Sequence, residues 1–422
     1  MTAATPAPSS PQRVAWSAAF GYRDFKLFQV ARLLSILGMQ MQSVAIGWQI
    51  YSVTGQPMSL AWVGLAQFFP AVGLSLVTGQ TADRVERRVI LVVCHVTMAA
   101  LSAGLFVLAR GRPSDVSPIY LVLVGVGVAR AFLGPANQSI LPTLVPAEHF
   151  GNAVAWGSSF WQVAMVLGPT LGGVLYAAFG GPSGVYALAG ACSLGACAFV
   201  MTMKAKGSPT GRSPVTRASL FAGVRYVKSN PIVFGAISLD LFAVLLGGAT
   251  ALLPVFARDI LHLGPWALGA LRSAPAAGAA VTALSLAIRP IEKAAGVKMF
   301  AGVLVFGLTT IVFGLSRSFA VSLVALALLG AADMVSVFVR SALVQLATPD
   351  AMRGRVSAVN MVFIGASNEL GEFESGLTAQ WLGAVPAVVF GGIGTLVVVA
   401  VCAWRFPALR RVNQLNDARP DA

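Results

Sequence analysis

Long apolar segments fill most of this sequence of 422 residues and restrict its fold more than any other feature. Separated by Gly, Pro or charged residues, they fall at 26–54, 58–79, 87–109, 117–143, 151–178, 182–203, 231–256, 263–288, 298–315, 318–346, 355–382 and 385–405. A helix needs about 20 apolar residues to cross a bilayer, and these segments are too continuously apolar for the strands of a barrel. We therefore predict an all-α integral membrane protein with twelve transmembrane helices.

The composition excludes a soluble protein. Apolar and aromatic residues make up 57% of the chain and charged residues only 10%, whereas about a quarter of the residues in soluble domains are charged. The mean hydropathy is +0.79. The same composition excludes disordered, collagen-like and disulfide-stabilised chains, and the four cysteines lie in apolar segments, where we expect packing rather than disulfides or metal binding.

Basic residues are distributed unevenly between the connections. If the N-terminus is cytoplasmic, the connections on the outside hold only Arg110, Arg112, Arg258 and Arg317, and most of the 29 Lys and Arg residues lie inside. We therefore predict that both termini are cytoplasmic. The net charge of +14 is assigned to this membrane face and not to nucleic acid, because the chain has no zinc-finger spacing and no run of five basic residues.

The longest connection and an internal repeat divide the chain. We predict an N-terminal tail at 1–25, six-helix halves at 26–203 and 231–405, a cytoplasmic linker at 204–230 and a C-terminal tail at 406–422. Gly64, Gln67, Pro70 and Gly73 recur 205 positions later as Gly269, Arg272, Pro275 and Gly278, and a second series recurs at a shift of 203. An even number of spans in each half makes the two halves parallel.

Charged residues inside the spans are the main candidates for chemistry, because each costs at least a few kcal/mol to insert into a membrane. They are the cations Arg32, Arg130, Arg272 and Arg340 and the acids Asp240, Asp333, Glu369, Glu372 and Glu374. At the shift of 203, Arg130 coincides with Asp333, so we expect these two to face each other across a cleft. Arg272 is the expected partner of Asp240. Ion pairs between packed helices and roles with substrate or protons both remain open for each residue.

From this set we select two groups. Glu369 and Glu372 are three residues apart on one helix face, and crowded carboxylates in a low dielectric suit reversible protonation. The proton-coupling candidates are Asp333, Glu369, Glu372 and Asp240. The candidates for lining a substrate cavity are Arg130, Arg272, Arg340, Trp161 and Gln67. Trp161 could stack on an aromatic substrate or simply pack at the membrane interface.

Enzymatic signatures are missing from the sequence. The three histidines lie on different segments with no spacing suited to a zinc site or a triad, and there is no phosphate-binding loop of the G-x-x-x-x-G-K type. We therefore expect neither an enzyme nor an ATP-driven pump, and no metal or cofactor. Energy would come from an ion gradient, with protons as the coupling ion.

The connection after the second span resembles a signature of the major facilitator superfamily. Residues 79–88, GQTADRVERR, are similar to the superfamily loop G-x-L-x-D-R-x-G-R-R/K. The resemblance implies a cytoplasmic gate formed by Gly79, Asp83, Arg84, Arg87 and Arg88. The equivalent segment of the second half, 289–293, lacks the Asp, so a symmetrical latch is not expected.

Two helical elements extend the resemblance. Arg130 and Gly134 are similar to the R-x-x-x-G element of the superfamily's fourth helix, which is linked there to proton coupling. Gly168, Pro169, Gly172 and Gly173 resemble the G-P-x-x-G-G end of the antiporter signature, which implies export. A bend that serves packing alone, without influence on direction, is the open alternative.

Finer similarity covers nearly the whole chain. The strings at 130–136, 271–275, 330–336 and 367–376 resemble the bacterial exporter branch typified by enterobactin exporters. This resemblance implies export of a siderophore or a drug from the cytoplasm. We expect a monomer in the bacterial cytoplasmic membrane that exports a small molecule, such as a siderophore, in exchange for protons. Broad efflux of drugs or macrolides is the alternative within the branch. A sensor or assembly factor without transport would not need so many buried charges.

Overall fold

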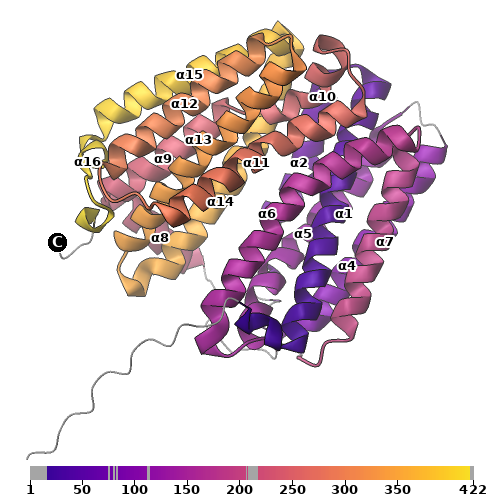
Figure 1. Ribbon diagram of the computed structural model, residues 1–422, viewed down its shortest axis with the longest axis horizontal. Coiled ribbons are helices and arrows are strands. Elements are labelled where there is room, and N and C mark those ends of the chain that lie inside the picture. The colour runs from indigo at the N-terminus through magenta and orange to yellow at the C-terminus, as the bar shows by residue number, and fades with distance from the viewer. Residues whose placement is uncertain are drawn as a thin grey trace, which may run out of the picture.

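The computed structural model describes residues 17–74, 77–78, 81, 84–111, 115–205, 207 and 217–418. Within these ranges the regular elements are all helices. Figure 1 shows two bundles that lie close together at the end carrying α10 and diverge at the end carrying α8. We call these the far end and the linker end. Gly79 and Asp83 of the predicted gate lie outside the described residues.

The first bundle contains six long helices in its described residues. They are α1 (Arg23–Thr54), α2 (Pro57–Gly73), α4 (Arg87–Arg110), α5 (Ser117–Ile140), α6 (Ala147–Ala178) and α7 (Pro182–Met201). Helix α1 packs between α6 and α7, α4 packs on α5 and α7, and α2 packs on α5. Proline at the first turn starts α2, α5 and α7, where its missing N–H has no helical partner to lose.

The second bundle also contains six helices that span it. They are α9 (Pro231–Leu246), α11 (Pro265–Ile288), α12 (Ala295–Leu315), α13 (Phe319–Leu346), α14 (Asp350–Leu382) and α15 (Ala384–Arg405). The short helices α8 (Arg217–Ser229) and α16 (Pro407–Arg411) flank them at the linker end. Ten helices in the described ranges are long and apolar enough to cross a membrane by themselves. The 17-residue α2 and the charged α14 complete the predicted set of twelve.

The seventh predicted span is not one continuous helix. Helix α9 ends at Leu246, and the chain continues through Gly247 and Gly248 into a 3-10 turn (Ala249–Leu252), α10 (Leu253–Val255) and a π-helical turn (Phe256–Ile260). A side chain on Gly247 would collide with the ring of Phe306, and one on Gly248 would collide with the backbone of α14. The glycines therefore allow the break and the close approach of neighbouring helices.

The two bundles touch through small residues near the far end. Helix α6 packs on α11, and α2 packs on α14. A Cβ on Gly173 would lie 2.9 Å from the Cα of Gly269, and a Cβ on Gly376 would lie 2.6 Å from the Cβ of Ala61. Gly168 and Gly172 pack instead against α1, next to the buried Pro169. The antiporter-like element therefore packs α6 on both bundles, as small residues do in membranes.

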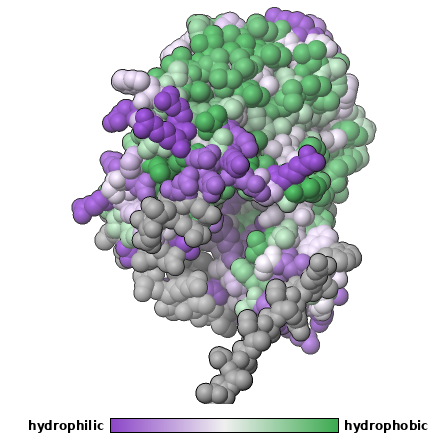
Figure 2. Space-filling model, turned by 60° about the vertical axis from the view of Figure 1, so that its left-hand side comes forward, coloured by the Kyte–Doolittle hydropathy of each residue, from purple (hydrophilic) through white to green (hydrophobic). Residues whose placement is uncertain are grey.

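The surface agrees with a membrane location. Figure 2 shows apolar side chains over the upper part of the molecule and hydrophilic side chains gathered lower down. Large apolar residues remain exposed outside the core, among them Trp404, Leu121 and Phe390. In water such a surface would be unfavourable, whereas lipid tails solvate it.

Candidate substrate and ion-coupling site

A cavity of about 150 Å³ lies between the two bundles. Four ionisable side chains line it: Arg130 from α5, Arg272 from α11, and Glu369 and Glu372 from α14. Gln67 of α2 also lines this cavity. Because each bundle contributes charged groups, any movement of one bundle against the other changes the distance between Arg130 and the charged groups of the second bundle.

Arg130 is oriented by the first bundle. Its Nη1 donates a hydrogen bond to Oε1 of Gln67 at 2.8 Å. Gly127 lies almost one turn before Arg130, and a Cβ there would collide with the backbone of Gln67. This glycine therefore lets α2 and α5 approach closely enough for the amide to hold the guanidinium.

Glu369 and Glu372 both face Gly64 of α2 in the first bundle. A Cβ on Gly64 of α2 would lie 3.2 Å from Oε2 of Glu372 and 3.3 Å from Oε2 of Glu369. Both carboxylates interact electrostatically with Arg130 and Arg272, but neither forms a direct ion pair within the part of the chain that is described. The four groups thus balance in charge while leaving room between them for a ligand.

A second charged cluster lies inside the second bundle, away from this cavity. Asp240 of α9 forms an ion pair with Arg340 of α13, and both side chains are almost fully buried. Asp333 lies two turns before Arg340 and lines a void of about 10 Å³ together with Asp240 and Ser336. Within the described residues, the Ser336 hydroxyl has no hydrogen-bond partner.

Three expectations are corrected by this cluster. The partner of Asp240 is Arg340 and not Arg272, because Arg272 points into the central cavity. Asp333 does not face Arg130, since it interacts with Asp240 and Arg340 within its own bundle. Arg340 does not line the central cavity. Sequence spacing gave the correct helix face for Asp333 and Arg340, but it could not give the rotation of α9 and α11 about their axes.

Two further cavities adjoin the first one, and Arg130 lines all three. One, of about 270 Å³, is lined by Arg32, His95, Asn137, Gln138 and Trp161 as well as Arg130. Trp161 and Arg130, both candidates for lining a substrate cavity, thus line the same space. Arg32 and His95 were not among the predicted cavity residues, although Arg32 stood out as a charge within a span. The other, of about 340 Å³, is mainly apolar and includes Phe68, Val72 and Met361.

The described arginines of the gate motif contact their own bundle. Arg88 donates to the carbonyl oxygen of Met201 at the end of α7. The backbone N–H of Arg87 donates to the carbonyl oxygen of Gly207 at 3.4 Å, and the Arg87 side chain is buried. Arg84 is exposed. Arg87 therefore joins the start of the linker to α4, and Arg88 joins α4 to the end of α7.

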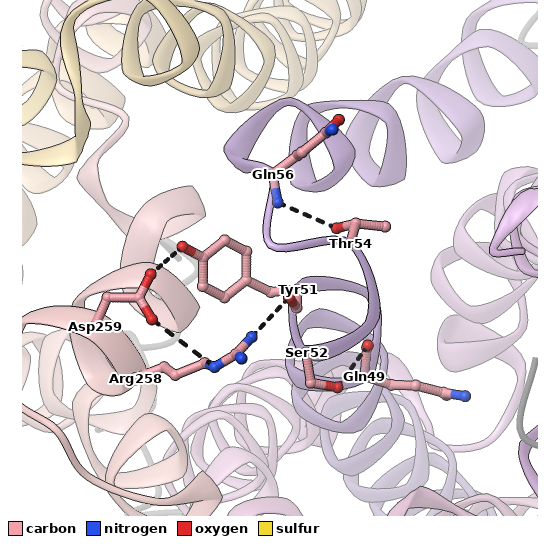
Figure 3. Close-up of polar contacts among 7 residues, drawn as sticks. All are labelled: Gln49, Tyr51, Ser52, Thr54, Gln56, Arg258 and Asp259. Atoms are coloured by element: carbon pink, nitrogen blue, oxygen red, sulfur yellow. Dashed lines mark hydrogen bonds and ion pairs between the residues drawn. The ribbon is translucent and has the colours of Figure 1, made fainter. Parts of the chain in front are cut away.

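The far end is closed by a polar contact between the bundles that sequence reasoning missed. Tyr51 at the end of α1 donates its hydroxyl to Asp259, and Nη1 of Arg258 donates to the Tyr51 carbonyl oxygen at 3.0 Å (Figure 3). The Arg258 guanidinium also lies over the Tyr51 ring, 5.6 Å from its centroid. Both partners belong to the π-helical turn after α10, which the sequence gave no sign of.

Comparison with known proteins places the chain in a family. The sequence model of the transmembrane secretion effectors, within the major facilitator superfamily, matches residues 15–420. The chain belongs to this family. Two similar proteins are the enterobactin exporters EntS of Citrobacter koseri and Escherichia coli O1:K1. Each is 27% identical to this chain over 394 residues, which is 92% of this chain and 93% of theirs.

Solved structures support the fold of this chain. A bacterial homologue of the human lysosomal transporter Spinster, in an inward-facing and occupied conformation, superposes with a TM-score of 0.72 at 14% identity and covers 93% of this chain and 99% of its own. A peptide transporter POT in complex with sulfate gives a TM-score of 0.73 at 14% identity, with 96% and 100% covered. The chain therefore has the fold of major facilitator transporters.

Proposed function

We propose that the chain exports a small molecule of the siderophore class across the bacterial cytoplasmic membrane in exchange for protons. The observation that carries this proposal is the cavity between the bundles, where Arg130 and Arg272 approach Glu369 and Glu372. Relatives that align over 92% of the chain are named enterobactin exporters. Arginines suit an oxygen-rich anion, and carboxylates suit protons, so one cavity holds both requirements of such an exchange.

The linker end faces the cytoplasm in this proposal. The positive charge of the connections supports that orientation. The bundles diverge at the linker end (Figure 1), and Gly134 and Gly365, beside the cavities, have open space where a Cβ would stand. Cargo would therefore enter from the cytoplasm and leave after the bundles rock and the far end opens.

Protons enter the cycle in the step after cargo release. With the far end open, protonation of Glu369 and Glu372 neutralises the acids opposite Arg130 and Arg272 and so changes the net charge of the cavity. Asp333 and Asp240 form a second acidic cluster, inside the second bundle. Return to the linker-open state releases the protons to the cytoplasm, and the empty cavity then accepts the next cargo molecule.

The test uses energised inverted vesicles that contain the chain. We expect a catecholate siderophore to accumulate inside the vesicles and the accumulation to collapse when the proton gradient is dissipated. Glu372→Gln should reduce the proton-dependent accumulation at least tenfold, whereas the matched change at the exposed Glu292 should leave it unaltered. Accumulation that persists without a gradient, or that is unaffected by Glu372→Gln, would contradict the proposal that protons are exchanged at this cavity.

Broad drug efflux is the second candidate, and one observation favours it. The adjoining cavity of about 340 Å³ is walled mainly by apolar side chains, including Phe68, Val72 and Met361, which would accept varied apolar molecules. A cationic dye and a macrolide in the same vesicles separate the two functions. Movement of these compounds without movement of the siderophore would favour drug efflux.

A further inference from the structure

Within the helices of the first bundle, the described charged residues away from the helix ends are cations, whereas the second bundle holds both acids and cations. Among the described residues of the first bundle, the acids are Asp24, Glu86, Asp115 and Glu148, and all four lie in connections or at helix ends. Arg32 and Arg130 therefore have no acid at their own depth within this bundle. Glu369 and Glu372 of the other bundle offset Arg130, so Arg32 is the charge left without compensation.

Arg32 is held by packing and not by an acid. Its Nη1 lies where a side chain on Gly157 of α6 would stand, 2.8 Å from the position of a Cβ. No ion pair or hydrogen bond to the Arg32 side chain is present among the residues that the structure describes. A cation within a membrane span is costly without a partner, so the site gains stability when an anion binds.

Other polar groups meet Arg32 in the same cavity. We call this cavity the basic lobe; it is the space of about 270 Å³ lined by Arg32, His95, Arg130, Asn137, Gln138 and Trp161. His95 is only 2% exposed, and its Nδ1 has no hydrogen-bond partner among the described residues. A buried polar atom that lacks a partner is costly and is satisfied by a ligand or a water molecule.

An aromatic wall completes the lobe. Trp161 of α6 is 43% exposed although it lies in the middle of its helix, and it lines the lobe with both arginines. An indole face stacks on planar rings, while guanidinium groups bind carboxylate or phenolate oxygens through paired hydrogen bonds. The Trp161 indole and the two guanidinium groups are therefore complementary to a flat ring that bears anionic oxygens.

We infer that the basic lobe binds a planar aromatic anion, with its oxygens on Arg32 and Arg130 and its ring on Trp161. Arg32 is then a specificity-determining residue that selects anionic over neutral rings, and His95 supplies a further polar contact. This inference rests on the proposed function in that the anion is a part of the exported molecule. It separates the cargo, held mainly by the first bundle, from the carboxylates of the second bundle.

Binding to the full chain in lipid nanodiscs tests the inference without any gradient. The probes are 2-naphthoate and its neutral counterpart 2-naphthamide, measured by isothermal titration calorimetry. We expect naphthoate to bind at least tenfold more tightly than naphthamide. Arg32→Gln should remove most of this preference, Arg32→Lys should retain part of it, and Arg317→Gln, at an exposed connection, should leave it unchanged. Trp161→Ala should weaken the binding of both probes.

Two results would overturn the inference. One is an unchanged preference for naphthoate in Arg32→Gln with the variant shown to be folded by its unfolding temperature. The other is binding of chloride as strong as that of naphthoate, which would make the lobe a site for simple inorganic anions. Naphthoate binding that depends on Arg32, together with no siderophore transport, would instead overturn the proposed cargo alone. Siderophore transport without Arg32-dependent binding of naphthoate would overturn only the inference that the basic lobe binds the anion.

Discussion

At the scale of single residues, the acids inside the membrane differ in what holds them. Asp240 is paired with Arg340 in the interior of the second bundle. Glu369 and Glu372 face two arginines across open space. Asp333 shares a small void with the paired acid. A buried ion pair resists the loss of either member, whereas an acid beside a cavity can change its protonation at lower cost.

This difference predicts how variants of the second bundle unfold. Arg340→Gln leaves Asp240 as an uncompensated buried charge and should lower the free energy of unfolding by about 3–5 kcal/mol. The double change Asp240→Asn with Arg340→Gln should recover most of this loss, and Asp333→Asn should cost little because it breaks no ion pair. Denaturant titration of the chain in nanodiscs measures all three. Equal losses in the single and double variants would contradict a specific pair.

At the scale of helices, small residues decide how closely the elements approach. Gly173 of α6 and Gly269 of α11 bring the backbones of the two bundles together near the far end. Near the linker end of the same α6, Gly151 has open space around it. The same residue type on one helix therefore has a packing role at one end and none at the other.

The matched pair of glycines gives a prediction about the opening of the far end. Gly173→Ala places a Cβ against α11 and should push the bundles apart there, so that the population with an open far end increases several-fold. Gly151→Ala should have no effect. Spin labels at the exposed connections Gln56 and Arg317 report the separation of the bundles as a distance distribution. A distribution that is identical in both variants would show that the glycine contact does not hold the far end closed.

Sequence patterns predicted the helices well because length and apolar content are local properties. Twelve spans follow from segment lengths and connections. The break in the seventh span at Gly247 and Gly248 depends on the neighbours α12 and α14 and was not predicted. Likewise, the repeat pointed to Gln67 and Arg272, which both line the central cavity, but the pairing of Asp240 required the rotation of each helix.

At the scale of the whole molecule, the described contacts between the bundles gather toward the far end, and the ribbons diverge at the linker end (Figure 1). The far-end contacts join α6 to α11, α2 to α14, and Tyr51 to the π-helical turn. If transport works by alternating access, these contacts must all break when the far end opens. The free energy of the far-end contacts then sets how often the cavity opens on that side.

The Tyr51 contact is the one whose contribution can be removed with least disturbance. Tyr51→Phe deletes the hydroxyl that donates to Asp259, a charge-assisted hydrogen bond worth about 1–2 kcal/mol, or roughly a 5- to 30-fold change in population. We expect the population with an open far end to increase by that factor, as measured by the distance distribution between spin labels at Gln56 and Arg317. Tyr120→Phe is the control, because its hydroxyl donates to the Ser59 carbonyl oxygen within the first bundle. An equal shift in both variants, or none in Tyr51→Phe, would mean that the contact shown in Figure 3 does not bias the two states.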